Sequence, residues 1–86
     1  MGEYRVVFAR SARRELESLD EPIRSRLFRH IERLGQVPRP PDCRKLVGAE
    51  NLWRIRVGLY RVLYALDDAK QLVDVVAVRH RRDAYR

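Results

Sequence analysis

Three arginines stand close together in the middle of the chain, with a spacing that suits anion binding. Arg54 and Arg56 precede Gly58-Leu59, and Arg61 follows it. Gly58-Leu59 is typical of a two-residue β-hairpin turn, with glycine at the first central position of a type II′ turn. This turn would place Arg56 opposite Arg61, and the two-residue period of a strand would put all three side chains on one face. Because guanidinium is planar, permanently charged and matched to phosphate oxygens, the sequence predicts a phosphate-binding face.

The turn also fixes the register, which divides the side chains of the hairpin between two faces. The predicted pairs are Val57–Tyr60, Arg56–Arg61, Ile55–Val62, Arg54–Leu63 and Trp53–Tyr64. The face that we expect helices to cover carries Trp53, Ile55, Val57, Tyr60, Val62 and Tyr64. Like charges opposite one another destabilise a sheet by up to about 1 kcal/mol, so a sequence selected only for folding would tend to avoid Arg56 opposite Arg61. The alternative is that the arginines are solvated and paired with carboxylates, the candidates being Asp67, Asp68 and Asp74.

Composition points to the same kind of partner. Nineteen Lys and Arg against twelve Asp and Glu give a formal net charge of +7, and all but Lys45 and Lys70 of these cations are arginine. This balance favours an anionic partner such as nucleic acid, although a soluble surface of unusual composition is the alternative. The single cysteine, Cys43, cannot form an internal disulfide and is compatible with a reducing compartment. No signal peptide or membrane span is visible, so we expect a cytoplasmic protein with no membrane partner.

The elements that must position the arginines begin with a strand and two helices. Residues 1–86 are expected to form a single domain, in which Tyr4–Phe8 alternates as a strand. A first helix is predicted from the spacing of Ala12, Leu16 and Leu19, with Ser11 as its N-cap. Asp20 is predicted to cap a second helix, with Pro22 in its first turn and Gly35 as its stop. The buried stripe of that helix is Ile23, Leu27, Ile31 and Leu34, and the two helices should form an antiparallel hairpin.

The second half of the chain has the pattern of a β-meander. Pro38–Pro41 reads as an extended connection. Three strands follow at Leu52–Val57, Tyr60–Leu66 and Leu72–Val78, and Arg44–Leu46 is a candidate edge piece. The order of strand, two helices and meander predicts an α+β fold, an antiparallel sheet with both helices on one face.

The residues after the last strand form a second basic group. His80-Arg81-Arg82-Asp83-Ala84-Tyr85-Arg86 ends the chain. If this tail is helical, Arg81 and Tyr85 lie on one side of it. A tyrosine this close to the end has little core left to join, which favours a functional role, and a frayed terminus is the alternative.

Together these segments resemble the RelE family of the RelE/ParE toxin superfamily. The motifs are Lys45-Leu46-x-Gly48, Trp53-Arg54-Ile55-Arg56-Val57-Gly58-x-Tyr60-Arg61-Val62-x-Tyr64 and His80-Arg81-Arg82-Asp83-Ala84-Tyr85. The resemblance covers nearly the whole chain. It implies a RelE-like microbial RNase fold and a type II toxin that cleaves mRNA in the A site of the 70S ribosome without a cofactor. It also implies a cognate RelB-like antitoxin bound in a hetero-oligomer.

The resemblance further implies roles for individual residues. Basic residues on the hairpin, an arginine after the last strand and a C-terminal tyrosine form the site in such toxins. The catalytic set would be Arg54, Arg61, Arg81 and Tyr85, and the RNA contacts would be Arg56, Lys45, Arg82 and His80. Several relatives carry lysine where Arg54 and Arg56 stand. Arg82 is an alternative to Arg81, and His80 is either a proton donor or a surface residue at a strand end.

The absence of an acidic cluster on the predicted face leads us to expect cleavage without a metal ion. The nucleophile would then be the 2′-hydroxyl of the RNA, which requires in-line positioning, stabilisation of a more negative phosphorane and two proton transfers. Tyr85 is the candidate base, since neighbouring cations favour its phenolate. Two other functions fit the same fold: a ParE-like gyrase inhibitor that is not a nuclease, and an RNA-binding domain without catalysis.

Overall fold

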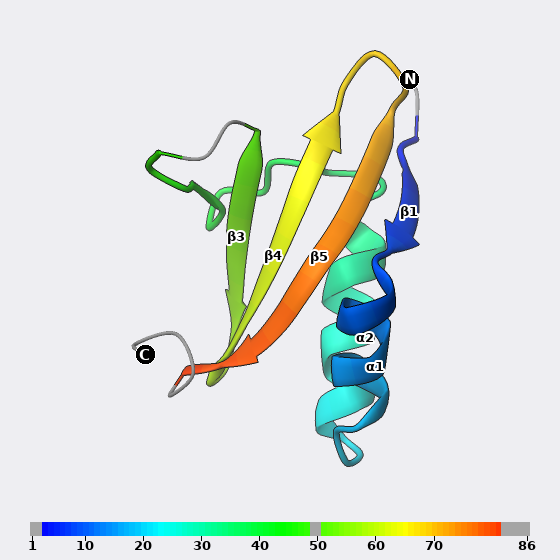
Figure 1. Cartoon of the computed structure of the whole chain (residues 1–86), viewed down its shortest axis with the longest axis vertical. Coiled ribbons are helices and arrows are strands. Elements are labelled where there is room, and N and C mark those ends of the chain that lie inside the picture. The colour runs from blue at the N-terminus through cyan, green and yellow to red at the C-terminus, as the bar shows by residue number, and fades with distance from the viewer. Residues whose placement is uncertain (1–2, 49–50, 82–86) are drawn as a thin grey trace.

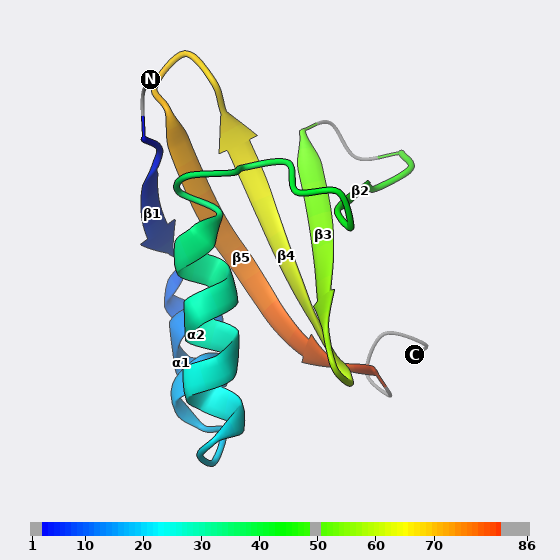
Figure 2. The same cartoon turned by 180° about the vertical axis from the view of Figure 1, so that it is seen from behind.

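The computed structural model describes residues 3–48 and 51–81. Its elements are β1 (Arg5–Phe8), α1 (Arg10–Glu17), α2 (Ile23–Arg33), β2 (Arg44–Lys45), β3 (Leu52–Val57), β4 (Tyr60–Asp67) and β5 (Leu72–His80). The strands form one sheet in the order β1-β5-β4-β3-β2. Both helices lie on one face of this sheet, behind it in Figure 1 and in front of it in Figure 2. The predicted α+β architecture, with a helical hairpin followed by a meander, is confirmed.

The sheet is mixed, which corrects the expectation of a wholly antiparallel one. Strands β3, β4 and β5 form the predicted antiparallel meander, whereas β1 runs parallel to β5, from Arg5 opposite Leu72 to Phe8 opposite Val75. Side-chain periodicity carries no information on strand direction, and no tight turn joins β1 to β5 to force an antiparallel pair. The helical hairpin and the meander lie between them in sequence, so their direction is set by tertiary packing.

Both predicted helix caps are wrong. Helix α1 begins at Arg10 after Ala9, whose N–H donates to the Val75 carbonyl at 2.8 Å, so Ser11 lies inside the helix. The pairing of β1 with β5 therefore determines where this helix starts. Helix α2 begins at Ile23 with Pro22 before it rather than in its first turn, and no side chain of an N-cap residue bonds to it.

Glu21 takes the place that was predicted for Asp20 at the start of α2. Its carboxylate accepts hydrogen bonds from the Ser25 N–H at 3.2 Å and from the Ser25 hydroxyl at 2.6 Å. These bonds satisfy a backbone donor in the first turn of the helix, as a side-chain cap does. The hydroxyl of Ser25 is also the main reason why the pKa of Glu21 lies below its ordinary value.

The end of α2 meets the first strand through a glycine. The helix ends at Arg33, just before the predicted stop at Gly35. The Tyr4 N–H donates to the Gly35 carbonyl at 2.7 Å. A Cβ atom at Gly35 would lie 2.8 Å from the Tyr4 carbonyl oxygen, so this close approach leaves no room for a side chain.

The core lies between the helices and the sheet. Helix α1 contributes Ala12 and Leu16, and the α2 segment contributes Leu27, Ile31 and Leu34 as predicted. The sheet contributes Ile55, Val57, Val62, Tyr64, Leu66, Val73, Val75 and Val78. Ile23 was predicted to belong to the buried stripe, but its side chain is 40% exposed because it is the first residue of α2, at the margin of the core. Leu19 packs against the core only in part.

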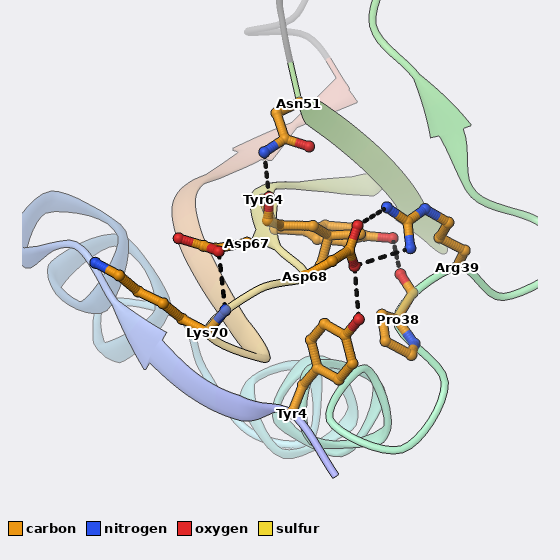
Figure 3. A network of polar contacts seen from close by, with 9 residues as sticks. Tyr4, Pro38, Arg39, Asn51, Tyr64, Asp67, Asp68 and Lys70 are labelled. Atoms are coloured by element: carbon orange, nitrogen blue, oxygen red, sulfur yellow. Dashed lines mark hydrogen bonds and ion pairs between the residues drawn. The ribbon is translucent and has the colours of Figure 1, made fainter. Parts of the chain in front are cut away.

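The segment between α2 and β2 crosses the helix side of the sheet and is held there by polar contacts (Figure 3). The buried Tyr64 hydroxyl donates to the Pro38 carbonyl at 2.8 Å. The Arg39 guanidinium donates to both carboxylate oxygens of Asp68 at 3.2 and 2.8 Å and lies 4.9 Å from the centre of the Trp53 ring. The Tyr4 hydroxyl donates to the same carboxylate at 2.6 Å. These contacts fix the segment to the β3–β4 hairpin on the face opposite the arginines.

Candidate phosphate-binding face

The β3–β4 hairpin has the predicted register throughout. Val57 pairs with Tyr60, Arg56 with Arg61, Ile55 with Val62, Arg54 with Leu63 and Trp53 with Tyr64. Gly58 has a φ of 60°, as the first central residue of a type II′ turn requires. Because an L-residue with a side chain rarely adopts this φ, glycine at position 58 allows the two-residue turn and so aligns the strands.

The alternation of buried and open side chains follows from this register. Ile55, Val57 and Val62 are buried against the helices. Arg54 and Arg56 alternate with them along β3, and Arg61 stands directly opposite Arg56, so all three lie on the face away from the helices. This is the open face turned toward the viewer in Figure 1. Arg56 is exposed, whereas Arg54 and Arg61 are half-buried.

Two of the three carboxylates named as candidate partners of the arginines, Asp67 and Asp68, accept hydrogen bonds from other groups. Asp68 accepts hydrogen bonds from Arg39 and Tyr4 on the other side of the hairpin. These bonds, that from Arg39 first, hold the pKa of Asp68 below its ordinary value. Asp67 accepts a hydrogen bond from the backbone N–H of Lys70 at 3.0 Å. Asp68 in particular stabilises the connection before β2.

The structure adds two arginines that were not predicted to belong to this face. Arg44 in β2 stands opposite Arg54, and Arg79 in β5 stands opposite Arg61. Arg56, Arg61 and Arg79 therefore form a row across three adjacent strands, which are about 4.8 Å apart. The row and the Arg44–Arg54 pair together define what we call the arginine face.

The sequence pattern did not assign Arg44 and Arg79 to this face, for two different reasons. Arg44 lies in a strand of two residues whose register no tight turn fixes. In β5, a register shift opposite Leu63 and Tyr64 leaves Val76 without a counterpart. Strict alternation from the buried Val73 would have put Arg79 on the helix side, and the bulge reverses this. After the bulge, the neighbouring residues Ala77 and Val78 are both buried, which strict alternation would not give.

Arg79 has a carboxylate partner at the edge of the sheet. Its guanidinium forms an ion pair with Glu15 of α1. The other oxygen of Glu15 accepts a hydrogen bond from the Val78 N–H at 2.9 Å. Glu15 thus contacts both the backbone and a side chain of β5.

Two predicted site residues lie on the helix side of the sheet rather than on the arginine face. His80 stands opposite Tyr60, and their rings lie edge to face with centroids 5.0 Å apart. Tyr60 belongs to the helix side, so His80 does not share the face of the arginines. Lys45 stands opposite Trp53, in the same relation, and is exposed.

The start of the C-terminal tail lies beside the hairpin turn. The Arg81 N–H donates to the Leu59 carbonyl at 2.6 Å, which brings Arg81 to the end of the sheet where Arg56 and Arg61 lie. Arg82 and Tyr85 lie outside the described residues. Within residues 3–48 and 51–81, no three His, Cys, Asp or Glu side chains gather as a metal site would require, and no helix is long and apolar enough to cross a membrane.

Comparison with known proteins places the chain in a family. The model of the family described as ParE toxin of type II toxin–antitoxin system, parDE, matches residues 6–85. Toxin RelG of Mycobacterium tuberculosis is 35% identical over an alignment of 91 positions, and the alignment covers 96% of this chain and 97% of RelG. The RelBE2 toxin–antitoxin complex of M. tuberculosis contains a chain with a TM-score of 0.79 and 30% identity, covering 92% of this chain and 99% of that one.

The same fold occurs in the intact Escherichia coli RelBE toxin–antitoxin complex, where the TM-score is 0.79 and the identity 26%. The match covers 90% of this chain and 95% of that one. The motifs of the hairpin and the tail, the fold and these relatives agree. The chain belongs to the RelE/ParE superfamily and is a RelE-family toxin of a type II toxin–antitoxin system.

Proposed function

We propose that this toxin is an endoribonuclease that cuts mRNA in the A site of the 70S ribosome. The observation that carries the proposal is the convergence of Arg54, Arg56 and Arg61 on the open face of the hairpin. Guanidinium groups at this spacing suit two or three oxygens of one phosphate or of neighbouring phosphates, and each can donate two parallel hydrogen bonds. Solvation alone does not account for placing Arg56 directly opposite Arg61.

The proposed reaction is a transesterification within the RNA. The 2′-oxygen attacks the adjacent phosphorus, and the bond from phosphorus to the 5′-oxygen breaks. The products are a 2′,3′-cyclic phosphate and a 5′-hydroxyl. Tyr85, as phenolate, accepts the proton of the 2′-hydroxyl, and water supplies the proton of the departing oxygen. No cofactor is needed for this chemistry.

The arginines stabilise the transition state in this mechanism. Arg54 and Arg61 hold the phosphate and the additional negative charge of the phosphorane. Arg81 donates a hydrogen bond to the departing oxygen, since guanidinium scarcely gives up a proton. Arg56 binds neighbouring backbone phosphate. Arg44, opposite Arg54, and Arg82 add contacts to RNA. Lys45 and His80 lie on the helix side of the sheet, so they would contact only RNA that extends beyond the arginine face.

We also propose that the toxin acts in the cytoplasm and is held inactive by a cognate RelB-like antitoxin in a hetero-oligomer. The solved relatives from M. tuberculosis and E. coli are toxin–antitoxin complexes, which supports this partner. An antitoxin that reduces the charge of the arginine face or covers it would block RNA.

The test is a cleavage assay on ribosomes programmed with a mapped mRNA. The purified toxin should cut within the A-site codon and should tolerate EDTA as far as the ribosomes do. Arg61→Ala and Tyr85→Phe should each lower the cleavage rate by about 100-fold or more with the fold intact. Arg33→Ala, which removes an exposed arginine of α2, is the matched control and should cleave at close to the wild-type rate. A normal rate for Tyr85→Phe would contradict the phenolate mechanism.

A ParE-like gyrase inhibitor is the second candidate. The match to a family model described as ParE toxin favours it. A supercoiling assay with purified gyrase separates the two functions. Inhibition of gyrase without cleavage on ribosomes would replace the nuclease proposal, and RNA binding without either activity would indicate an RNA-binding domain.

A further inference from the structure

Arg79 occupies a place in the arginine row but is bound to a carboxylate. Its backbone is aligned with Arg61, directly across from it in the neighbouring strand. Its guanidinium is paired with Glu15 of α1, and the two side chains are 46% and 29% exposed respectively. Arg79 therefore keeps part of its surface open to solvent while one carboxylate offsets its charge.

Glu15 is held in place independently of Arg79. Strand β1 pairs with β5 only as far as Val75, so no strand among residues 3–48 and 51–81 lies beside the rest of that edge of β5. Glu15 accepts the Val78 N–H at 2.9 Å in this uncovered part. A carboxylate here satisfies a backbone donor that an edge strand would leave open. The same bond keeps its second oxygen beside the guanidinium of Arg79.

We propose that Glu15 restrains Arg79 from binding RNA, and that an RNA phosphate and the Glu15 carboxylate compete for this guanidinium. The inference rests on the proposed RNA-binding role of the arginine face. Glu15 is then a positioning residue that limits affinity for the RNA backbone, and Arg79 is a reserve contact in the row with Arg56 and Arg61. Such a limit suits an enzyme that must release one RNA strand to reach the next.

Glu15→Gln separates the charge of Glu15 from its structural role. The amide oxygen of glutamine still accepts the Val78 N–H, but the charge that holds Arg79 is lost. Binding is measured by fluorescence anisotropy with a 2′-O-methyl RNA oligonucleotide, which lacks the attacking hydroxyl. E15Q should bind about three- to tenfold more tightly at low salt, as one additional charge-assisted contact would give. The slope of log K against log salt should steepen by about 0.7, the value for one more phosphate contact on a single strand.

Three further variants decide between restraint and a general effect of charge. Glu17→Gln removes the same charge from α1 and breaks an ion pair with Arg13, so it should leave the salt slope unchanged. Arg79→Ala alone should weaken binding by less than about twofold, because Glu15 already engages the group that it removes. Adding Arg79→Ala to E15Q should abolish the gain.

The inference fails if E15Q and wild type share one affinity and one salt slope. It also fails if the gain survives in the double variant, or if Arg79→Ala alone weakens binding as much as Arg61→Ala. If E15Q lowers the melting temperature, the Arg79→Ala comparison still decides the question. These titrations do not involve the ribosome, so failure of the nuclease proposal appears separately as an absence of cleavage by the wild-type toxin.

Discussion

Reversing the charge of Arg56 should raise the free energy of unfolding while lowering the rate of RNA cleavage. Arg56 lies directly opposite Arg61 in the β3–β4 pair and is exposed. A like-charge pair at this position costs a few tenths of a kcal/mol up to about 1, and an opposite-charge pair contributes about as much. Arg56→Glu exchanges the first for the second, so the free energy of unfolding should rise by about 0.5–1.5 kcal/mol after solvent screening.

For a domain of this size, about 1 kcal/mol shifts the melting temperature by about 4–8 °C. The increase is measured by circular dichroism at low ionic strength and should shrink in concentrated salt, because salt screens the pair. Cleavage on programmed ribosomes should fall in the same variant, since the face then carries a carboxylate where RNA phosphate should bind. A more stable but less active protein is the expected result for a residue retained for function.

The double variant Arg56→Glu/Arg61→Glu tests whether the gain is a pair effect. It restores two like charges across the strands and lowers the net charge further. If Arg56 faces Arg61, stability should return toward that of the wild type. If the double variant is instead more stable still, the gain comes from the overall charge of the protein, and our account of the arginine face is wrong.

Three other predictions concern the scaffold. Tyr64→Phe removes the hydroxyl that donates to the Pro38 carbonyl and should lower the free energy of unfolding by about 1 kcal/mol in urea titrations. The pKa of Asp68 lies below its ordinary value because Arg39 and Tyr4 donate to its carboxylate. The contribution of Asp68 to stability is therefore present above its ordinary pKa and is lost as the pH falls through the pKa of the folded state. Asp68→Asn should remove this part of the acid sensitivity in melting curves recorded between neutral and acid pH. Leu27→Ala, at a fully buried position of α2, should cost about 2–5 kcal/mol, and a cost below about 1 kcal/mol would contradict the assigned core.

The parts of the site that could be predicted from sequence are those fixed by local rules. A two-residue turn with glycine at position 58 leaves one register, and the period of two then assigns every side chain of the hairpin to a face. For this reason Arg54, Arg56 and Arg61 were placed correctly without any knowledge of the rest of the chain. Helix stripes around Leu16 and Leu27 are equally local and were also correct.

The errors arose where distant parts of the chain decide the outcome. The start of α1 depends on the bond between Ala9 and Val75 rather than on the capping preference of Ser11. The direction of β1 depends on how the helices pack, and no pattern within Arg5–Phe8 records it. The position of Arg79 on the arginine face was not predicted, because a single additional residue in β5 reverses the face on which its side chain lies. The roles of all the site residues stay predictions, and Arg82 and Tyr85 also lie outside the described residues.

The bond between the Arg81 N–H and the Leu59 carbonyl has a consequence for how this toxin tolerates change. The β3–β4 turn aligns the strands β3 and β4, which carry arginines, and through this bond it also holds the residue that follows β5. Sequence drift beyond position 81 therefore leaves the point of departure where it is, whereas a lengthened turn would displace the row and the exit together. The length of that turn therefore constrains the arginine row and the start of the tail at once.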